Sequence, residues 1–553
     1  MKDVFILSFC SRFAREKKNL KMMPFGVGAS RLGANFENTS DGSFEYENKI
    51  SVESSQVNGK YFVIDAQGGV SNKTGPWIIM IDLSGKDYIN LKDARLEIGY
   101  KVTRRDGTKI NTLGCQVAPV NLLPLVMWES IEVRLNGQPM SGGSSVNMGY
   151  KAFLEAMLSS DNDASMTHML TQFLHMDTAG QYDNHNLSTI HLMKAFRRQV
   201  DEGRITLPSA DDYKMIGPGA TKVDGAAMTD AEIMAENKTR RKKKDEELYK
   251  LFATHMGSDN ELVRSHFQAE TYAAESYNHG FNTRAAICAD SEEFTLFSPI
   301  PHDFFSFENY LAPFNKVEIK LTKYPDRFLL NTEQESDEFR LELTKLKLHL
   351  HSVIRRESIE PPLKETYKFV ETQLFKQVVP GYMRNYSFRM FHTGIMPKSI
   401  LLAMVRTSAA DGKYNLNPFN FHHFNLRRIS LVINGEEYPS GGLQFRWLNR
   451  ANPEVMVGYQ WMYANSGAIA NNRGNIVDLS HFSGGCFIIP FDLTPDRCNG
   501  RHTHNAEFGF IDVYLDFEEP LPVSITVLYE LMFNKVLIND KTTGTVAVVD
   551  IAA

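Results

Sequence analysis

The sequence predicts a mainly β protein made of two tandem jelly rolls, which are antiparallel β-sandwich domains, with short helices and a partly helical insertion in the first. Apolar and polar residues alternate through many short segments, a pattern typical of half-buried antiparallel strands. The order of these segments repeats in the second half of the chain. Each half offers about eight strands and corners rich in glycine and proline, which favours a sandwich over alternating strands and helices.

The chain has 553 residues, of which 42% are hydrophobic and 23% charged. This length exceeds what one hydrophobic core usually serves, and the composition is ordinary for a globular protein. A boundary is expected near 355–365, because Pro361 and Pro362 cannot donate to a strand ladder. We therefore expect an N-terminal arm at 1–60, a first jelly roll at 61–355, a second at 362–540 and a C-terminal tail at 541–553.

Charge and cysteine usage exclude some classes of protein. The formal net charge of −6 argues against a folded surface devoted to nucleic acid, so such contact would come from a local arm or patch. The five cysteines are scattered and form no CxxC, which indicates neither a disulfide framework nor a zinc knuckle and fits a reducing compartment. No stretch has the roughly 20 apolar residues of a membrane span, and we expect no signal peptide.

In the first half, Leu96, Ile98, Tyr100 and Val102 alternate with polar residues and predict a strand. The stretch "SIEVRLNGQPMSGG" at 130–143 predicts a strand, a turn (corner) at Asn-Gly and a Ser-Gly-Gly segment (exit) that leaves the hairpin. Next, "NMGYKAFLEAMLSS" has apolar residues at helical spacing. The polar and charged segment at about 178–292 is interpreted as the insertion. In the later strand "FRLELTKLKLHLHSVI", the alternation slips after Leu343, which indicates a bulge.

The second half repeats this order. "RISLVINGEEYPSGG" at 428–442 matches the earlier strand, corner and exit, and the helix-like "FRWLNRANPEVMVGYQWMYA" follows. "FTLFSPIPHD" then corresponds to "CFIIPFDLTPD", and "VEIKL" to "IDVYL". A long strand closes each half. This ordered set of similarities predicts that the two halves share one topology.

The run 144–183 resembles the signature of the hexon-like double jelly-roll major capsid proteins of polinton/Maverick elements and adintoviruses. The signature positions are Tyr150, Lys151, Phe153, Leu154, Glu155, Asp177, Thr178 and Gly180. Where family members tend to carry Tyr-Pro-Tyr before Lys-Ala, this chain has Asn147-Met148-Gly149-Tyr150. The tail from "FDLTPD" to "VLYELMFNKVLIN" is also similar to that family, so the resemblance covers most of 61–540.

The resemblance implies a major capsid protein of an icosahedral double-stranded DNA virus or virus-like element. Three chains would form a homotrimer whose six jelly rolls make a pseudo-hexameric capsomer. Its partners would be neighbouring capsomers, penton and minor capsid proteins, and packaged DNA contacted through the N-terminal arm; a disordered tail is the alternative for the arm. The location would be the virion capsid, assembled in the host cell nucleus. No enzymatic activity and no cofactor are implied.

Two other kinds of motif also have simpler structural interpretations. The basic run Arg240, Arg241, Lys242, Lys243 and Lys244 suggests a nucleic-acid or nuclear-import patch, but acidic residues follow it at once, so a solvated helix face is the alternative. The histidine pairs are His349 and His351, His422 and His423, and His502 and His504. They suit strand faces or loops better than a metal site, for which we expect no ligands.

We found no phosphate-binding loop, nucleophile elbow or HExxH motif, and we expect no catalytic residues. The alternative from another class is a double jelly-roll enzyme that processes glycans, or a sugar-binding protein. Such an enzyme would need carboxylates that converge in a groove between the domains, with perturbed pKa values. A domesticated element copy that no longer builds particles is a third possibility.

Overall fold

The computed structural model describes residues 56–551 with several gaps. The gaps are 71–74, 83–84, 86, 111–115, 141–145, 204, 207–227, 257–276, 334–338, 357–361, 393, 448–452, 470–472, 498–503 and 505–506. The chain divides into two compact units, Met1–Ser54 and Ser55–Ala553. All described residues belong to the second unit, so most of the predicted arm lies outside them.

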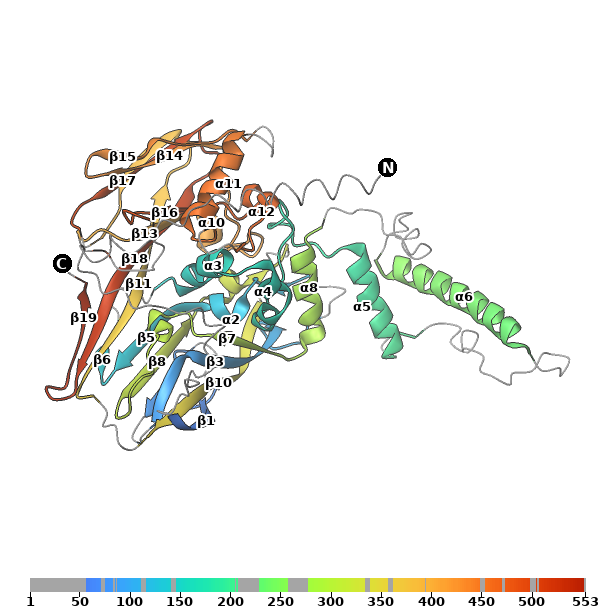
Figure 1. The fold of residues 1–553 in the computed structure, drawn as a ribbon. Coiled ribbons are helices and arrows are strands. Elements are labelled where there is room, and N and C mark those ends of the chain that lie inside the picture. Colours follow the sequence, from blue (N-terminus) through green and yellow to red (C-terminus); the bar gives the residue numbers. More distant parts are fainter. Residues whose placement is uncertain are drawn as a thin grey trace, which may run out of the picture. The chain divides into compact units, whose positions relative to one another are not determined.

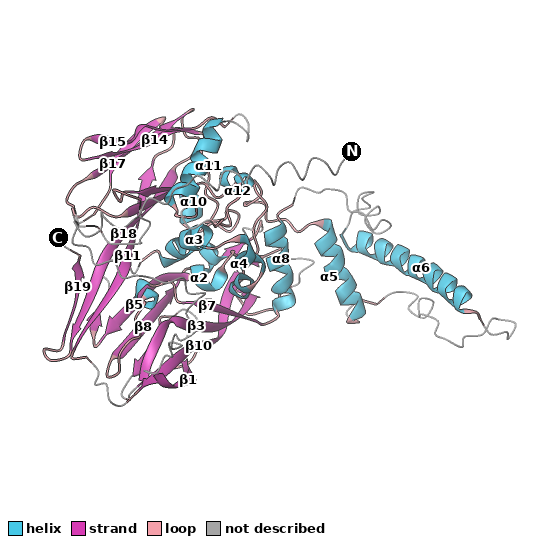
Figure 2. Ribbon diagram, in the orientation of Figure 1, coloured by secondary structure: helices cyan, strands magenta, loops and turns pink. Residues whose placement is uncertain are grey.

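Strands dominate the described residues, and they come in two successive sets (Figures 1 and 2). The first set is β1 (Gln56–Asp65), β2 (Trp77–Asp82), β3 (Asp87–Arg104), β4 (Ala118–Pro119), β5 (Trp128–Leu135), β6 (Gln138–Pro139), β7 (Phe294–Pro299), β8 (Lys316–Lys323), β9 (Leu330–Asn331) and β10 (Phe339–Arg355). The second is β11 (Lys364–Val379), β12 (Asn385–Arg389), β13 (Ser399–Arg406), β14 (Leu426–Ile433), β15 (Glu436–Gln444), β16 (Ile488–Asp492), β17 (Ile511–Phe517), β18 (Ile525–Asp540) and β19 (Thr545–Asp550).

Helices occupy the connections between these strands. The α-helices are α2 (Leu123–Val126), α3 (Met148–Ser159), α4 (Asn162–Met166), α5 (Thr189–Asp201), α6 (Asp230–Met256), α8 (His279–Ile287), α9 (Asp326–Leu329), α10 (Thr407–Ala410), α11 (Pro453–Asn465) and α12 (Leu479–Ser483). Short 3-10 helices lie at His168–Gln172, Ala289–Ser291 and Asp303–Ser306. The predicted insertion is partly helical, because α5, α6 and α8 lie within it.

The two strand sets have the same topology. In the first, the sheets run β1-β10-β3-β7 and β2-β8-β5-β6; in the second, they run β11-β18-β13-β16 and β12-β17-β14-β15. Counting the eight strands of each set in chain order, and leaving out the short β4 and β9 and the added β19, both halves pair first-eighth-third-sixth and second-seventh-fourth-fifth. All pairs within these four sheets are antiparallel. This is the order of an eight-stranded jelly roll. The predicted fold class is confirmed.

The repeated Asn-Gly corners are alike in atomic detail. Asn136 and Asn434 have φ values of 52° each, and the glycine that follows each also has positive φ. The Asn136 side-chain oxygen accepts a hydrogen bond from the Lys316 backbone N–H at 2.9 Å. The Asn434 oxygen accepts one from the Phe510 N–H at 3.0 Å. An asparagine serves here because it tolerates the left-handed conformation and pairs with the adjacent strand.

Several details of the strands were predicted correctly and others were not. The slip after Leu343 is a register shift between β10 and β3, as expected for a bulge. β1 starts at Gln56, inside the stretch predicted as the arm, and the predicted C-terminal tail contains β19, which pairs with β18. The predicted exit Ser440-Gly441-Gly442 lies within β15. The local turn chemistry was recognised, but the pairing that keeps these glycines in the sheet was not.

The helix predicted from 445 onward begins only at Pro453. Phe445 and Trp447 lie before it and outside any helix, and their rings stack at 5.4 Å. Both rings also meet Phe487 edge-on, at 5.4 and 5.3 Å. The helical spacing of these aromatic residues was therefore misleading, because tertiary packing against Phe487 places them.

The buried apolar residues of the two jelly rolls belong to one continuous cluster, which extends from Ala66 to Leu537. A second, smaller cluster belongs mainly to the insertion and includes Phe196, Leu248, Phe252 and Phe281. None of the helices among the described residues combines the length and the apolar character needed to cross a membrane.

Candidate functional site

Helix α3 lies at the junction between the two jelly rolls. Its sequence places apolar residues at helical spacing, as predicted, and Tyr150, Phe153 and Leu154 are at most 1% exposed. A surface helix normally buries one stripe and leaves the opposite side in water. In α3, Lys151 is also buried, at 3% exposure. The helix therefore has packing partners on more than one side.

Aromatic side chains form the apolar part of the junction. The Tyr150 ring meets Phe328 of the first half at 5.5 Å and Phe419 of the second half at 5.4 Å. Phe153 stacks on Phe419 at 4.7 Å and meets Phe421 edge-on at 5.7 Å. Offset and edge-on pairs of this kind add about 0.5–1.5 kcal/mol each beyond their buried area. The rings therefore hold the two halves together.

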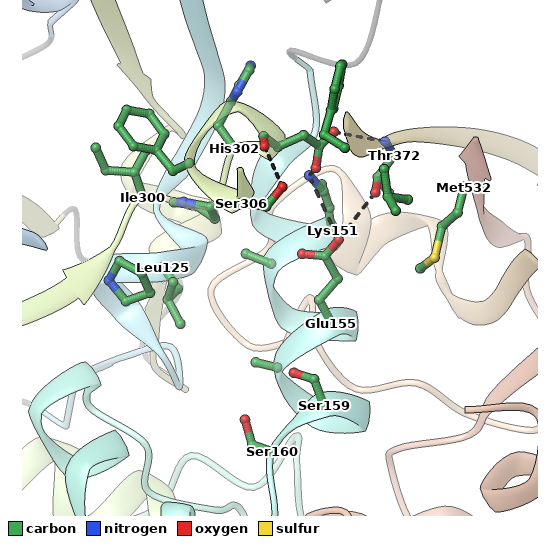
Figure 3. A pocket seen from close by; sticks show the side chains of 18 of the residues that line it. Leu125, Lys151, Glu155, Ser159, Ser160, Ile300, His302, Ser306, Thr372 and Met532 are labelled. Carbon is green, nitrogen blue, oxygen red and sulfur yellow. Dashed lines mark hydrogen bonds and ion pairs between the residues drawn. The ribbon is translucent and has the colours of Figure 1, made fainter. Parts of the chain in front are cut away.

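A polar cluster surrounds the buried Lys151, and Figure 3 shows Lys151, Glu155 and Thr372 of this cluster. The Lys151 ammonium pairs with Asp303 and lies 3.8 Å from Glu155. Asp303 also accepts a hydrogen bond from the Thr372 backbone N–H at 2.8 Å, and the Thr372 hydroxyl donates to Glu155 at 3.4 Å. Because Thr372 belongs to β11, these bonds tie the first jelly roll to the second.

Glu530 of β18 belongs to the same cluster but is not paired in the same way. It is fully buried, and neither carboxyl oxygen has a hydrogen-bond partner among the described residues. Burial raises the pKa of Glu530 well above its ordinary value, and the nearby Glu155 carboxyl adds to the effect. Burial alone would lower the pKa of Lys151, but Asp303 and Glu155 outweigh it and raise that pKa. Lys151 is thus charged, while Glu530 favours its protonated form.

An open groove of about 1140 Å³ borders this cluster. Its lining comes from both halves and includes Lys151, Glu155 and Asp303 on one side and Thr372 and Lys398 on the other. The side chain of His302 also lines it; burial lowers the pKa of His302 to about 4, and its Nε2 atom has no partner among the described residues. The groove is therefore polar where the two jelly rolls meet.

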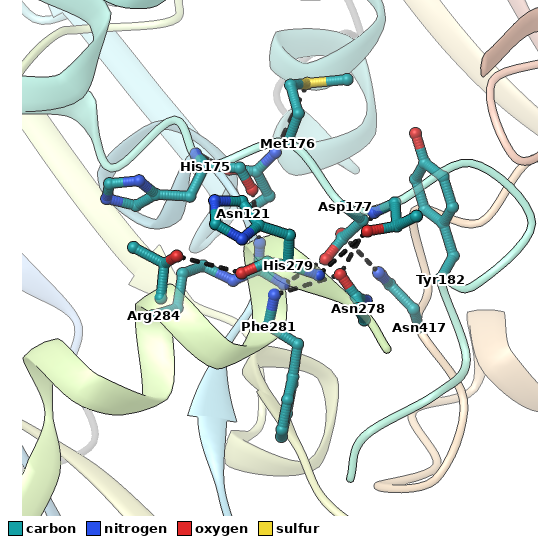
Figure 4. Close-up of polar contacts among 12 residues, drawn as sticks. Asn121, His175, Met176, Asp177, Tyr182, Asn278, His279, Phe281, Arg284 and Asn417 are labelled. Carbon is teal, nitrogen blue, oxygen red and sulfur yellow. Dashed lines mark hydrogen bonds and ion pairs between the residues drawn. The ribbon is translucent and has the colours of Figure 1, made fainter. Parts of the chain in front are cut away.

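A second buried network surrounds Asp177 (Figure 4). The Arg284 guanidinium donates to Asp177 at 2.7 Å and to the backbone carbonyls of Pro119 and His175 at 2.8 and 2.7 Å. Arg284 is fully buried and Asp177 is 2% exposed. The other Asp177 oxygen accepts from Asn417 of the second half at 3.2 Å. A buried ion pair whose remaining donors are satisfied in this way fixes the geometry of the junction.

The neighbouring residues extend this network across the junction. Asp183 accepts hydrogen bonds from the Asn417 backbone and the Asn420 side chain, each at 2.8 Å. The Gly180 N–H donates to the Gly484 carbonyl at 2.6 Å, and the Tyr182 hydroxyl lies 3.0 Å from the Cys486 thiol. The segment that follows Asp177 is thus bonded to the second jelly roll along much of its length.

The predicted signature residues therefore lie together at or beside the junction. Tyr150, Phe153, Glu155, Asp177 and Gly180 contact the second half directly. Lys151 acts through Asp303, which bonds to Thr372. Leu154 is buried in the core, and Thr178 bonds to Asn278 and His279 at the end of the insertion.

Sequence reasoning missed Asp303, Glu530, Arg284 and Asn417, which complete the two networks. One signal was available for Glu530, which is a single acid within the apolar run "ITVLYELMF". An ionisable residue in such a strand is seldom fully buried without a specific environment. The other three lie in loops or in a short helix, where the sequence carries no periodicity that would reveal their burial.

The basic run lies on α6, in the insertion. Arg240 pairs with Glu236 at 3.1 Å, four residues earlier, and Lys244 lies 3.7 Å from Asp201 of α5. Arg241, Lys242 and Lys243 are exposed. The i,i+4 pairing matches the simpler alternative, a solvated helix face; the nucleic-acid or import role stays a prediction.

The histidine pairs have separate surroundings. His349 lies 2.8 Å from Glu97, and His351 packs against the Tyr61 ring at 4.6 Å. His422 lies 3.8 Å from Asp183, and His423 stacks on Trp447 at 3.6 Å. His504 bonds to Asp496 at 2.8 Å, while His502 lies outside the described residues. Within the described part of the chain, no group of three or more His, Cys, Asp or Glu side chains is arranged to hold a metal ion.

Comparisons with known proteins agree with this architecture. No protein-family model matches the chain. An uncharacterized protein of Caenorhabditis elegans is 19% identical over 474 residues, which cover 84% of this chain and 91% of the relative. A chain in the 3.5 Å cryo-EM structure of the Sputnik virophage is 10% identical, covers 94% of each chain and superposes with a TM-score of 0.53.

The crystal structure of the mavirus major capsid protein is 9% identical, with 94% of this chain and 96% of that one covered and a TM-score of 0.46. At these identities, structural similarity concerns the fold. The likeness to the virophage chain shows that this protein shares its fold, in agreement with the jelly-roll order of both strand sets.

Proposed function

We propose that this chain is the major capsid protein of an icosahedral double-stranded DNA virus or virus-like element. It would assemble as a homotrimer whose six jelly rolls form a pseudo-hexameric capsomer. The observation that carries the proposal is the pairing of two jelly rolls of identical strand order through a continuous buried junction. Such a unit presents two domains of nearly equivalent fold to its neighbours, so that three copies can form a ring of six similar domains.

The junction supports a role in which geometry matters more than chemistry. Aromatic contacts and the hydrogen bonds from Thr372 to Asp303 and from Asn417 to Asp177 all restrict movement between the halves. A capsid subunit benefits from such rigidity, because an angular error in each subunit accumulates around a closed shell. The resemblance at 144–183 and the fold shared with a chain of a virus particle point the same way.

The partners and location follow from this proposal. Capsomers would contact neighbouring capsomers, penton proteins and minor capsid proteins, and the basic residues of the N-terminal arm would contact packaged DNA. The protein would reside in the virion capsid and assemble in the host cell nucleus. The resemblance of 144–183 to the capsid proteins of polinton elements and adintoviruses favours an element of that kind.

The test is the mass of the purified full-length chain in solution, followed by negative-stain imaging of the same sample. A stable species at three times the chain mass of 62.7 kDa, with a hexagonal outline or as closed shells, is expected. A chain that stays monomeric at high concentration, with no shells across a range of salt and pH, would contradict the proposal.

One observation favours the alternative of a glycan-processing enzyme, namely the carboxyl groups at the groove between the domains. Glu155 and Asp303 line it, and the pKa of Glu155 is raised, chiefly by burial. However, Asp303 is held by Lys151 and Thr372, and Glu530 does not line the groove. Glycoside hydrolysis needs two carboxyl groups free to reach the sugar. Hydrolysis of a glycan library that Glu155→Gln abolishes would establish the alternative.

A further inference from the structure

His185 lies in the segment that leads from the junction to the insertion, and its side chain is fully buried. Neither ring nitrogen has a hydrogen-bond partner among the described residues. The ring packs on Phe281 of α8, with the ring centroids 5.3 Å apart. Buried polar atoms are normally hydrogen-bonded, so an imidazole that is enclosed without partners requires a specific explanation.

The chain is anchored to a different part of the molecule on each side of His185. Before it, Asp183 accepts hydrogen bonds from Asn417 and Asn420 of the second jelly roll, each at 2.8 Å. After it, the Ser188 N–H donates to a side chain of α8 at 2.7 Å. A change at His185 therefore acts where the anchor to the second jelly roll meets the anchor to the insertion.

Carboxyl groups surround the His185 ring without bonding to it. The charged groups that act on it are Asp183, Glu333, Asp177 and Arg284. The Glu333 Oε1 atom lies 4.0 Å from the ring Nδ1 and accepts the His185 backbone N–H at 3.3 Å. Asp177 is already paired with Arg284. The acceptors within reach of a protonated ring are therefore Glu333 and Asp183.

Asp183 cannot serve a protonated His185 and keep all of its present partners. One of its oxygens accepts from the Asn417 backbone and the other from the Asn420 side chain. On the same side as Asn420, the His422 Nε2 atom lies 3.8 Å from it. A protonated imidazole has two N–H donors and a charge that is costly to bury unpaired, so it competes for this carboxylate.

We propose that His185 is an acid-sensitive switch of the junction: its protonation detaches Asp183 from Asn417 and Asn420 of the second jelly roll. The neutral ring fits its enclosed place beside Phe281, whereas the charged ring needs the carboxylate or water. The inference concerns a single chain and does not depend on the proposed function. In a capsid subunit, the switch would leave the junction closed at neutral pH and loosen it in an acidic compartment.

The direction of the pH effect follows from burial. Burial lowers the pKa of His185, and the carboxyl groups of Asp183, Glu333 and Asp177 oppose this only in part. A histidine in the unfolded or opened chain titrates near pH 6.5. The stability that neutral His185 contributes is therefore full above about pH 6.5 and is lost as the pH falls toward the folded value.

The experiment measures hydrogen exchange of the Asn417 backbone amide in the purified full-length chain at about pH 7.5 and about pH 5.5. This N–H donates to Asp183, so its exchange reports whether that bond opens. After correction for the effect of pH on the intrinsic exchange rate, the opening equilibrium should rise up to roughly tenfold at the lower pH.

Two variants assign this response to His185. His185→Phe keeps a ring against Phe281 and cannot be protonated, and it sacrifices no hydrogen bond of the described chain. His185→Gln is the second variant, in case the larger ring disturbs the segment. Both should show the same Asn417 exchange at the two pH values. His168→Gln is the matched control, because His168 is exposed, and it should respond like the wild type.

Three results would overturn the inference. The first is a wild-type chain whose corrected Asn417 exchange does not change with pH, a result that needs no variant to fold. The second is a His185→Phe or His185→Gln variant that responds as the wild type does. The third is a response that His422→Gln abolishes while both His185 variants keep it, which would place the acid-sensitive group on the other side of Asp183. The trimer mass tests the proposed function separately.

Discussion

The Asn-Gly corner of the first jelly roll is hydrogen-bonded to a network that reaches the second jelly roll, whereas the same corner of the second lies next to exposed aromatic residues. Asn136 donates to Asn315 at 2.9 Å, and Asn315 joins Glu365 and Asn539 of the second jelly roll in a buried network. Near Asn434, Phe508 is 76% exposed and Phe510 is 41% exposed. The corners themselves have the same backbone conformation and the same strand bond.

This difference shows that a repeated sequence motif determines a local structure but not its surroundings. The backbone at each corner is fixed by short-range chemistry, in which a left-handed asparagine and a glycine close a two-residue turn. Which groups the corner contacts depends on the rest of the molecule. Paired substitutions in the two copies therefore separate local from tertiary contributions to stability.

The largest difference is expected between the two helices. Phe153→Ala on α3 removes a buried ring that stacks on Phe419 of the second half, so it should lower the free energy of unfolding by about 3–5 kcal/mol. Met456→Ala on the exposed side of α11 should change it by less than about 0.5 kcal/mol. Denaturant unfolding of both variants at a concentration that keeps the chain monomeric measures the difference. Equal losses would contradict the comparison.

A smaller difference is expected between the two corners. Asn136→Ala and Asn434→Ala both place alanine at positive φ and remove the strand bond, at a cost of about 1–2 kcal/mol each. Asn136→Ala should cost about 1 kcal/mol more, because the buried Asn315 loses one of its hydrogen bonds. The two unfolding free energies, measured under the same conditions, test this order; a larger loss for Asn434→Ala would refute it.

Glu530 of the second jelly roll and Glu97 of the first should contribute to stability with opposite dependence on pH. The raised pKa of Glu530 means that its contribution to stability is full below the unfolded value of about 4.3 and is lost as pH rises through the folded value. For Glu97 on the first jelly roll, burial alone would raise the pKa, but hydrogen bonds from Lys345 and His349 outweigh it and lower that pKa. Its contribution is present above about pH 4.3 and is lost as pH falls.

Between the unfolded and folded pKa values of Glu530, the stability of the wild type should fall by up to about 1.4 kcal/mol per pH unit. Glu530→Gln should remove this fall and stabilise the chain at neutral pH. Glu97→Gln should instead reduce the loss of stability that occurs as the pH falls below about 4.3. Unfolding free energies of the wild type and both variants, measured across pH, provide the test. A Glu530→Gln variant whose pH profile matches that of the wild type would contradict the raised pKa, because it would show that Glu530 binds its proton equally well in the folded and unfolded chain.

The smallest effect is expected in the insertion, which has no counterpart in the second jelly roll. Arg240→Ala removes the i,i+4 pair with Glu236 on α6 and should cost no more than about 0.5 kcal/mol. Thermal unfolding measures this. A loss of several kcal/mol would mean that the basic run is part of a structural network rather than a solvated helix face.

Much of the fold was predictable because it depends on local periodicity. The alternation of apolar residues gave most of the strands, the spacing in "YKAFLEAML" gave α3, and the Asn-Gly pairs gave both hairpins. The shared order of segments also anticipated the identical topology of the two halves. Each of these signals is contained within a few residues or in their order along the chain.

The errors arose where distant residues decide the structure. The glycines at 441 and 442 remain in β15 because that strand pairs with β14 on both sides of an irregularity. Phe445 and Trp447 are fixed by Phe487 rather than by a helix. The strand β19 in the expected tail exists because β18 extends far enough to pair with it. No local pattern carries this information.

The sequence by itself thus determined two jelly rolls, the corners that turn them and the helix that bears Tyr150, Lys151 and Glu155. Only the tertiary structure decided that these residues meet Asp303, Thr372 and Glu530 at a junction. It also decided that Lys151 on α3 is buried while Met456 on α11 is exposed. The reason is physical: strand and helix periodicity follow from neighbours in the chain, whereas burial and charge pairing depend on groups that folding brings together from hundreds of residues apart.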